Sequence, residues 1–375
     1  MNNTGLVTAG EARALERRDL YFAPTGVGDQ LMFLAAAERY FQKTGEKLLL
    51  AHQYPELAGN SDSSLILAGA DSETVERLYV EQSQAKKNFT GRSVLIDGVE
   101  FNLKYVSYYD LRVNRKGLFI NRLPDKHILA RLCERLGLAG EIEIAPRLNL
   151  DGGEKEFGRL SGKRQIALMT GGKMRYKHFP PGLAGAIIEA LGSEYDFVQL
   201  GGVGDPPLAG ARPLMGKLTL RQTAAVLYNS VLFVGAIGGL MHLARAVGCP
   251  SVIAFAAEPL ASEYYTTNSY VFASVPCAEC AEGRLDPFYD PCPHEYRCLS
   301  GIGPGQMIAA VREKLSAAPA GYPPQTASLT PAPVAGLELW HRYRVLAAQR
   351  MGTADYMRWT HSLKNPGRPG EAGAP

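Results

Sequence analysis

Three glycine-containing turns carry the side chains of this sequence that are best suited to chemistry. The first turn, Gly26-Val-Gly-Asp29, follows an apolar run at 20–23 and precedes a helix-like stretch that starts at Gln30. Gly26 and Gly28 let the backbone turn tightly and approach a ligand, while Asp29 would begin the helix. A carboxylate there can take the proton of a hydroxyl group, and the alternative is an ordinary helix cap behind a glycine turn.

The second turn, residues 170–180, combines glycines with three cations just ahead of a helix that starts at a proline. Its glycines are Gly171 and Gly172, and its cations are Lys173, Arg175 and Lys177. Such a loop would receive phosphate well, and a cation in it would neutralise the charge that develops on a departing diphosphate. A solvated basic loop is the alternative interpretation.

The third turn, with Gly238 and Gly239, lies between a predicted strand at 231–234 and a predicted helix at 240–247. Backbone N–H groups at the positive end of a helix form a second candidate site for phosphate. His242 lies one turn into this helix, and we interpret it as a packed histidine that is hydrogen-bonded to a neighbouring loop. No chemistry is assigned to it.

Four cysteines cluster in the proline-rich loop 276–300, at Cys277, Cys280, Cys292 and Cys298. Four thiols can bind zinc or a single iron tetrahedrally, and a site without an open coordination position would be structural. The alternatives are two disulfides or free thiols, and His294 could replace one cysteine. Cys133 and Cys249 occur in apolar contexts that are typical of the core.

The composition indicates a folded, soluble protein. The chain has 375 residues, of which 46% are hydrophobic and 21% charged, with a formal net charge of +3. The small charge argues against a dedicated nucleic-acid surface. The first residues lack the apolar core of a signal peptide, and no later run has the roughly 18 apolar residues of a transmembrane helix. We therefore expect a cytoplasmic location.

Two α/β domains with doubly wound parallel sheets are predicted, because the strand, glycine turn and helix pattern repeats along the chain. Expected strands are at 20–23, 47–52, 93–96, 103–106, 165–169, 197–200, 231–234, 251–255 and 270–272, and expected helices are at 30–41, 128–138, 182–191, 220–228 and 240–247. The domains span 1–157 and 158–315, with glycines 152, 153, 158 and 162 marking the linker between them. An Ala/Pro-rich spacer at 316–333, a helical appendage at 334–364 and a disordered tail at 365–375 follow.

The order of these motifs resembles glycosyltransferase family 9, the ADP-heptose-dependent transferases and their relatives. The resemblance covers roughly residues 20–315 and rests on four segments, at 26–29, 176–180, 217–227 and 234–250. It implies a GT-B fold of two facing Rossmann-like domains and an inverting transfer. Asp29 would be the general base, Lys177 would contact the leaving diphosphate, and Gly238 and Gly239 would lie under the donor.

The cysteine segment also resembles a branch of this family that includes autotransporter heptosyltransferases, in which cysteines hold iron. One iron ion per chain is therefore expected, with zinc as the alternative.

One position departs from the family. The acidic residue that usually precedes the glycine turn is replaced by Ile237, so one polar contact to the donor is missing, and Glu258 after the next strand could compensate. The expected reaction transfers heptose or a related sugar from a nucleotide donor to a hydroxyl of a glycan or protein. The alternatives are a catalytically silent binding module, which would assemble as a homo-oligomer or with a partner protein through the C-terminal helix that contains Trp340, and a nucleotide-sugar epimerase.

Overall fold

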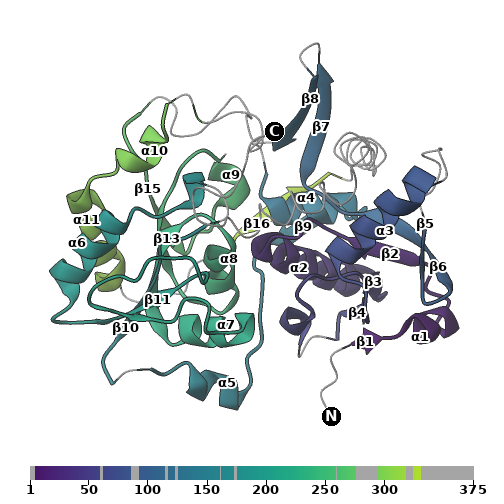
Figure 1. Ribbon diagram of the computed structural model, residues 1–375, viewed down its shortest axis with the longest axis horizontal. Coiled ribbons are helices and arrows are strands. Elements are labelled where there is room, and N and C mark those ends of the chain that lie inside the picture. The colour runs from purple at the N-terminus through teal and green to yellow at the C-terminus, as the bar shows by residue number, and fades with distance from the viewer. Residues whose placement is uncertain are drawn as a thin grey trace. The chain divides into compact units, whose positions relative to one another are not determined.

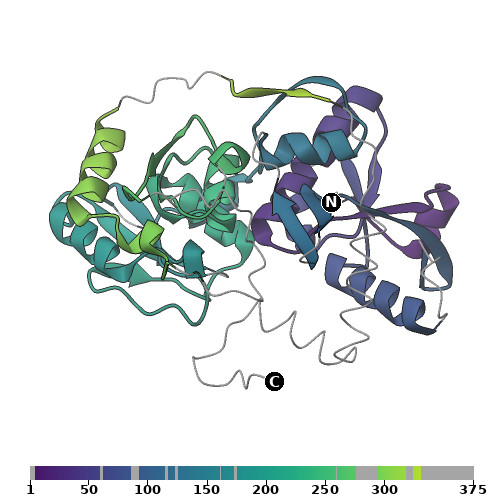
Figure 2. The same ribbon diagram turned by 90° about the horizontal axis from the view of Figure 1, so that it is seen from above.

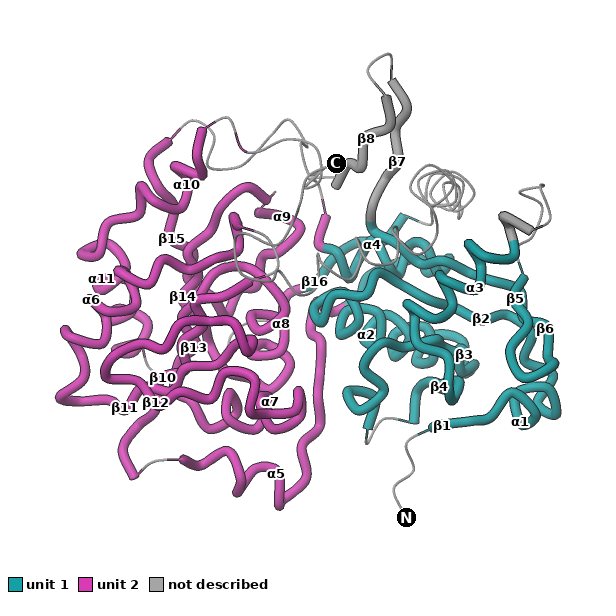
Figure 3. The backbone as a smooth tube through the Cα atoms, viewed as in Figure 1, with its two compact units in different colours: residues 1–118, 128–142, 326–366 teal, residues 119–127, 143–325, 367–375 magenta. Residues whose placement is uncertain are grey.

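The computed structural model describes residues 5–59, 62–85, 93–114, 117–122, 126–160, 162–172, 175–258, 260–275, 292, 294–317 and 324–330. The chain divides into two compact units (Figure 3). The described parts of unit 1 lie within residues 1–118, 128–142 and 326–366, and those of unit 2 lie within 119–127, 143–325 and 367–375. The predicted appendage 334–364 and tail 365–375 lie outside the described residues.

Unit 1 contains a six-stranded sheet in the order β1-β4-β3-β2-β6-β5. Neighbouring strands are parallel except β5, which runs antiparallel to β6. The sheet is doubly wound about β2, because the chain continues to β3 on one side and later to β6 on the other. The strands are β1 (Leu6–Val7), β2 (Asp19–Phe22), β3 (Leu48–Leu50), β4 (Ser64–Leu67), β5 (Ser93–Ile96) and β6 (Val99–Tyr105).

The antiparallel edge is a hairpin that the sequence analysis did not anticipate. Asp97 and Gly98 form its two-residue loop and have φ values of 47° and 75°. An Asp-Gly pair is a common choice for a tight turn of this type, since both central residues need positive φ. The edge strand therefore returns directly beside β6 instead of crossing over through a helix.

Helix α2 (Val27–Thr44) packs against α4 (Ile128–Arg135) in unit 1. The side chain of Glu134 in α4 is fully buried and accepts a hydrogen bond from the backbone N–H of Thr330 at 2.8 Å, just after β16. The remaining elements are α1 (Ala9–Ala14), η1 (Pro55–Ala58), α3 (Ser72–Ala85) and two small sheets, which pair β7 (Tyr109–Asn114) with β8 (Gly117–Arg122) and β9 (Gly140–Glu143) with β16 (Thr326–Leu329).

Unit 2 contains a second six-stranded sheet, which is parallel throughout and has the order β12-β11-β10-β13-β14-β15. The strand order reverses between β10 and β13, which pair directly. In open sheets of this kind, ligands bind beyond the carboxyl ends of the strands at the reversal. The strands are β10 (Gln165–Met169), β11 (Asp196–Leu200), β12 (Ala211–Pro213), β13 (Ser230–Ala236), β14 (Ser251–Ala254) and β15 (Asn268–Val271).

Helices cover both faces of this sheet. Figures 1 and 2 show α6 and α11 side by side on one face, and α7 and α8 pack together on the other. The helices of unit 2 are α5 (Gly152–Phe157), η2 (Arg175–Lys177), α6 (Pro181–Leu191), α7 (Leu220–Tyr228), α8 (Gly239–Ala246), α9 (Leu260–Glu263), α10 (Arg297–Ser300) and α11 (Pro304–Ser316). Among the described helices of both units, none combines the length and apolar character needed to cross a membrane.

The elements predicted from periodicity are present. The strands at 93–96 and 165–169 and the helix at 220–228 begin and end at the predicted residues, and the other predicted elements shift by a few residues. The glycine-rich segment interpreted as a linker contains a helix, α5, whose N-terminus is closed by a capping box between Asp151 and Glu154. The predicted spacer 316–333 contains β16.

Helix α5 is fixed to α7 by both charge and close approach. Arg221 Nη2 donates to Glu154 Oε2 at 2.6 Å, and Asn229 Nδ2 donates to the Lys155 carbonyl at 2.7 Å. A Cβ atom added at Gly158 would lie 1.9 Å from the carbonyl oxygen of Ala225. Gly158 therefore serves close packing between helices and not flexibility.

We expect Gly158→Ala to lower the free energy of unfolding by about 1–3 kcal/mol, because the added methyl group must push α5 away from α7. Gly152→Ala in the same helix is the matched control, since a Cβ there meets no atom within 4 Å. Thermal melting followed by circular dichroism compares the two variants. Equal melting temperatures for both variants and the wild type would contradict the packing role.

Candidate functional site

Asp29 lies at the carboxyl end of β2, where the strand order of the first sheet reverses. It is in the first turn of α2, and Gly26 is the N-cap of that helix. A Cβ atom added at Gly26 would lie 2.2 Å from Oδ2 of Asp29, so the carboxylate occupies space that only glycine leaves open.

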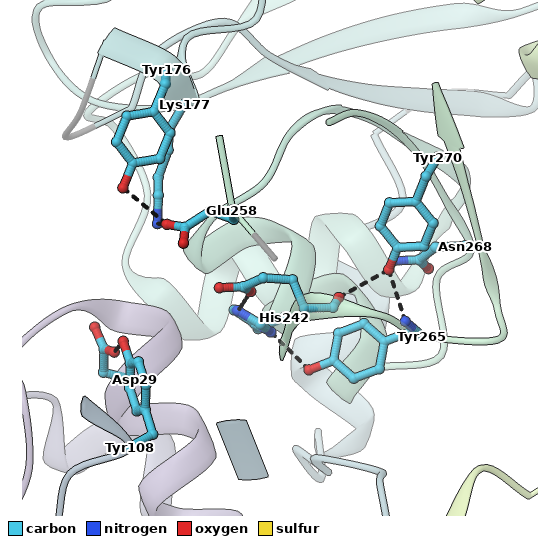
Figure 4. A network of polar contacts seen from close by, with 10 residues as sticks. Asp29, Tyr108, Tyr176, Lys177, His242, Glu258, Tyr265, Asn268 and Tyr270 are labelled. Carbon is cyan, nitrogen blue, oxygen red and sulfur yellow. Dashed lines mark hydrogen bonds and ion pairs between the residues drawn. The ribbon is translucent and has the colours of Figure 1, made fainter. Parts of the chain in front are cut away.

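Two tyrosines flank this carboxylate. The hydroxyl of Tyr108, a buried residue that follows β6, donates a hydrogen bond to Oδ1 of Asp29 (Figure 4). Burial, with a further contribution from the charge of Asp29, raises the pKa of Tyr54 to about 12. The Tyr54 phenol therefore stays neutral beside the acidic group.

A buried polar network fixes the backbone beneath Asp29. The Gln30 side chain is fully buried and donates from Nε2 to the carbonyls of Ala23 at 3.1 Å and Pro24 at 2.8 Å. His52 Nε2 lies 3.1 Å from the Gln30 carbonyl oxygen, and the backbone N–H of Tyr54 donates to His52 Nδ1 at 3.1 Å. Since Nδ1 accepts, His52 is neutral with its proton on Nε2. Burial lowers the pKa of His52 to about 4.

In unit 2, Lys177 and Tyr176 both contact one buried carboxylate. Glu258 is fully buried after β14, and its Oε1 lies 3.4 Å from Lys177 Nζ. The Tyr176 hydroxyl donates to the same oxygen at 2.9 Å (Figure 4). Ala257, just before Glu258, has a φ of 63°, which is uncommon for a residue with a side chain. The contact brings together two residues that the sequence analysis had proposed separately, Lys177 and Glu258.

The third glycine turn follows β13, the strand between β10 and β14 in the sheet. Gly238 is the N-cap of α8 and has a φ of 151°, a conformation open to glycine and strained for other residues. It follows β13, which pairs with β10 on one side and β14 on the other. Ile237 is fully buried, so this position offers an apolar side chain to the core and no polar group to a ligand.

Asp205 is a candidate that the sequence analysis missed. Its carboxylate follows β11 and accepts a hydrogen bond from the Gly202 N–H at 3.0 Å. A Cβ atom would lie 1.9 Å from Asp205 Oδ1 at Gly171 and 2.0 Å from Oδ2 at Gly201. Burial raises the pKa of Asp205 against the opposing effect of the Gly202 N–H. The available signal was a second Gly-Val-Gly-Asp, at 202–205, which repeats the motif at 26–29.

The other predicted residues of the basic turn differ in their surroundings. Gly172 approaches the backbone of Lys177, where an added Cβ would lie 2.5 Å from its carbonyl oxygen. Arg175 is exposed, and its guanidinium lies over the Tyr296 ring at 5.5 Å. Lys173 lies outside the described residues. Gly28 is buried in the first turn of α2.

His242 is a packed core residue, as predicted. Its Nδ1 lies 2.7 Å from the hydroxyl of Tyr265, and its Nε2 lies 3.0 Å from Glu263 Oε2 (Figure 4). Tyr270 donates from its hydroxyl to the Glu263 carbonyl at 3.0 Å. This network holds α8 to the segment between β14 and β15.

The structure describes only two of the four cysteines that were predicted to bind a metal. Cys277 and Cys280 lie outside the described residues, Cys292 is partly exposed, and Cys298 is buried in α10. Within the described part of the chain, no group of three or more potential ligands is close enough to hold a metal. Cys133 and Cys249 are buried free thiols, as expected of core residues.

Comparison with known proteins gives a family match and several structural matches. The model of glycosyltransferase family 9 (heptosyltransferase) matches residues 208–280, which include Gly238, Gly239 and Glu258. ADP-heptose LPS heptosyltransferase II of E. coli is 15% identical over 80% of this chain and 98% of its own, with a TM-score of 0.53. The iron-containing dodecameric glycosyltransferase TibC of enterotoxigenic E. coli is 18% identical over 79% of this chain and 76% of its own, with a TM-score of 0.56.

TibC in complex with ADP-D-beta-D-heptose gives 19% identity and a TM-score of 0.53 over the same shares of both chains. No curated protein matches the chain.

These findings define the class of the protein. The two α/β units have the GT-B fold predicted from the sequence, since structures with that fold match most of the chain. The resemblance to glycosyltransferase family 9 is likewise confirmed, by the family match at residues 208–280.

We expect the stability of the fold to decrease as the pH falls below neutrality. The pKa of His52 is about 4 in the folded protein, below its ordinary value of 6.5, so between these values the unfolded chain binds a proton that the native chain does not. The contribution of neutral His52 to the free energy of unfolding is present above pH 6.5 and falls by about 2 kcal/mol by pH 5. His127, with a pKa of about 3 caused mainly by burial, acts in the same direction.

Urea denaturation from pH 7 to pH 5 measures this effect. His52→Asn should weaken the pH dependence, while His178→Asn, at an exposed histidine, should leave it in place. A wild-type protein with constant stability over this range would contradict the assignment of neutral buried histidines.

Proposed function

We propose that this protein is a cytoplasmic inverting glycosyltransferase that transfers heptose or a related sugar from a nucleoside diphosphate donor to a hydroxyl of a glycan or protein. The observation that carries the proposal is the family 9 match over the segment that contains the Gly238 turn and Glu258, the buried partner of Lys177. The match supports glycosyltransferase activity, and the donors of the structurally similar proteins are consistent with a nucleotide sugar.

Unit 1 would supply the general base. In the proposed step the acceptor oxygen attacks the anomeric carbon, and Asp29 takes the hydroxyl proton. The bond between the anomeric carbon and the phosphate oxygen breaks, and its electron pair leaves on the diphosphate. A single displacement of this kind inverts the configuration at the anomeric carbon.

Unit 2 would supply the charges that receive the leaving group. The Lys177 ammonium neutralises developing negative charge, and backbone N–H groups at the start of α8 favour phosphate. The 3.4 Å contact with Glu258 keeps the lysine in one place before the donor arrives. The pair is close to neutral, so the anionic donor must compete with Glu258 for the ammonium.

The nucleoside would be held through Asp205. An acidic residue beyond the second strand of a Rossmann-type sheet commonly accepts hydrogen bonds from ribose hydroxyls. Asp205 has this placement, after β11, the strand beside β10. Ile237 cannot make the polar contact that an acidic residue would make, so the identity of the donor does not follow from the family resemblance. A panel of ADP-, GDP-, UDP- and dTDP-sugars is the direct way to identify it.

Asp29→Asn should lower the transfer rate by about two to four powers of ten, because the amide cannot take the proton.

Lys177→Met should lower the rate by about 10²–10³-fold and also weaken nucleoside diphosphate binding, which Asp29→Asn should leave intact. Transfer assays and calorimetry with the nucleoside diphosphate measure the two effects.

Lys163→Met is the matched control for the loss of one lysine, since that side chain is 56% exposed and its Nζ lies 4.0 Å from Asp196 Oδ1. A chain that binds no nucleoside diphosphate and transfers no sugar would favour the silent binding module. Conversion of the donor sugar without any acceptor would favour the epimerase.

We also propose that the four cysteines bind one structural iron or zinc ion per chain. Cys292 is partly exposed and Cys298 is buried in α10, and thiolates suit both metals. TibC, a structurally similar protein, is iron-containing, which favours iron. TibC is also dodecameric, and a homo-oligomer formed through residues 334–364 remains a proposal for this chain.

Elemental analysis of the full-length protein should give about one iron or zinc per chain. Cys298→Ser should abolish most metal binding, because three thiolates hold these ions less well than four. Cys249→Ala, at a buried cysteine outside the cluster, should retain the metal. A stable wild-type protein without metal would rule the site out.

A further inference from the structure

Tyr108 is a buried residue to which the proposed mechanism gives no role. It is 4% exposed and follows β6, the strand that pairs in parallel with β2. The two strands therefore end at the same edge of the sheet, and this arrangement brings the Tyr108 hydroxyl to Oδ1 of Asp29 although the residues are 79 positions apart (Figure 4).

The two oxygens of Asp29 have different surroundings. Oδ1 accepts the hydrogen bond from Tyr108, while Oδ2 lies over Gly26, at a place where a Cβ would come within 2.2 Å. A carboxylate held at one oxygen cannot rotate freely, so its second oxygen keeps one direction. The free space over Gly26 lets Oδ2 occupy that direction.

We propose that Tyr108 is a positioning residue for Asp29, which holds Oδ1 so that Oδ2 takes the proton of the acceptor hydroxyl. This inference rests on the proposed role of Asp29 as general base. In the step, the acceptor O–H bond breaks and an Oδ2–H bond forms, and Tyr108 keeps its own proton throughout. Tyr108 does not touch the substrate in this scheme.

The charges around Asp29 explain why such a residue is useful. Asp29, Glu56 and Glu73 all act to raise the pKa of Tyr54, so three carboxylates share its surroundings. Neighbouring like charges repel a carboxylate. The hydrogen bond donated by Tyr108 holds the Asp29 carboxylate in place against this repulsion.

Tyr108→Phe tests the proposal in the full-length protein. We expect kcat at neutral pH to fall about tenfold, the KM for the donor to stay unchanged, and the acid limb of the kcat profile to move about one pH unit higher. Tyr105→Phe, which removes the hydroxyl of another buried tyrosine in the same segment, should not move the acid limb. In an Asp29→Asn background, Tyr108→Phe should cause no further loss.

Two results would overturn the inference. One is a Tyr108→Phe variant with the wild-type kcat and pH profile. The other is a loss of kcat with an unmoved acid limb, which would show a merely structural role. Failure of the proposed function looks different, because the wild-type chain would then transfer no sugar. Failure of the proposed role of Asp29 alone would leave full transfer in Asp29→Asn.

Discussion

A buried carboxylate that needs compensation organises unit 2 of this molecule. Glu258 follows β14, whereas its partners Lys177 and Tyr176 follow β10, and β13 lies between those strands in the sheet. An isolated charge in the interior costs several kcal/mol, so the carboxyl ends of three parallel strands must stay together to satisfy it. The positive φ of Ala257 is part of the same constraint, because the chain turns sharply to direct Glu258 inward. The Gly238 turn follows the middle strand, between the two strands that carry these partners.

Space, as much as flexibility, explains the glycines at the carboxyl edges. Asp29 Oδ2 fills the volume that a side chain at Gly26 would need, and both oxygens of Asp205 do the same at Gly171 and Gly201. Each unit therefore uses glycine to make room for a carboxylate at the carboxyl edge of its sheet. Where a positive φ is also required, as at Gly201 with a φ of 145°, conformational freedom adds a second reason.

Local patterns predicted the fold well and the site in part. Apolar runs such as 165–169 identify buried strands, and the alternation of strands with helices predicts their parallel order. The Asp29, Lys177 and Gly238 turns follow from glycine spacing and charge, both of which are local. Tyr108 and Glu258 gain their roles from contacts 79 and 82 positions along the chain, which no local pattern contains. The close approach of Gly158 to Ala225 could not be predicted either, because Ala225 lies in another helix.

Ile237 has a consequence for the discrimination between stereoisomers. A side chain that accepts a hydrogen bond rejects a sugar whose hydroxyl points elsewhere, because its own buried acceptor is then left unpaired. A fully buried isoleucine imposes no such penalty on either epimer. In the proposed site, the carboxyl end of β13 would therefore recognise the anionic part of a donor and tolerate variation in its sugar. Selection among epimers would depend on side chains of the other strand ends.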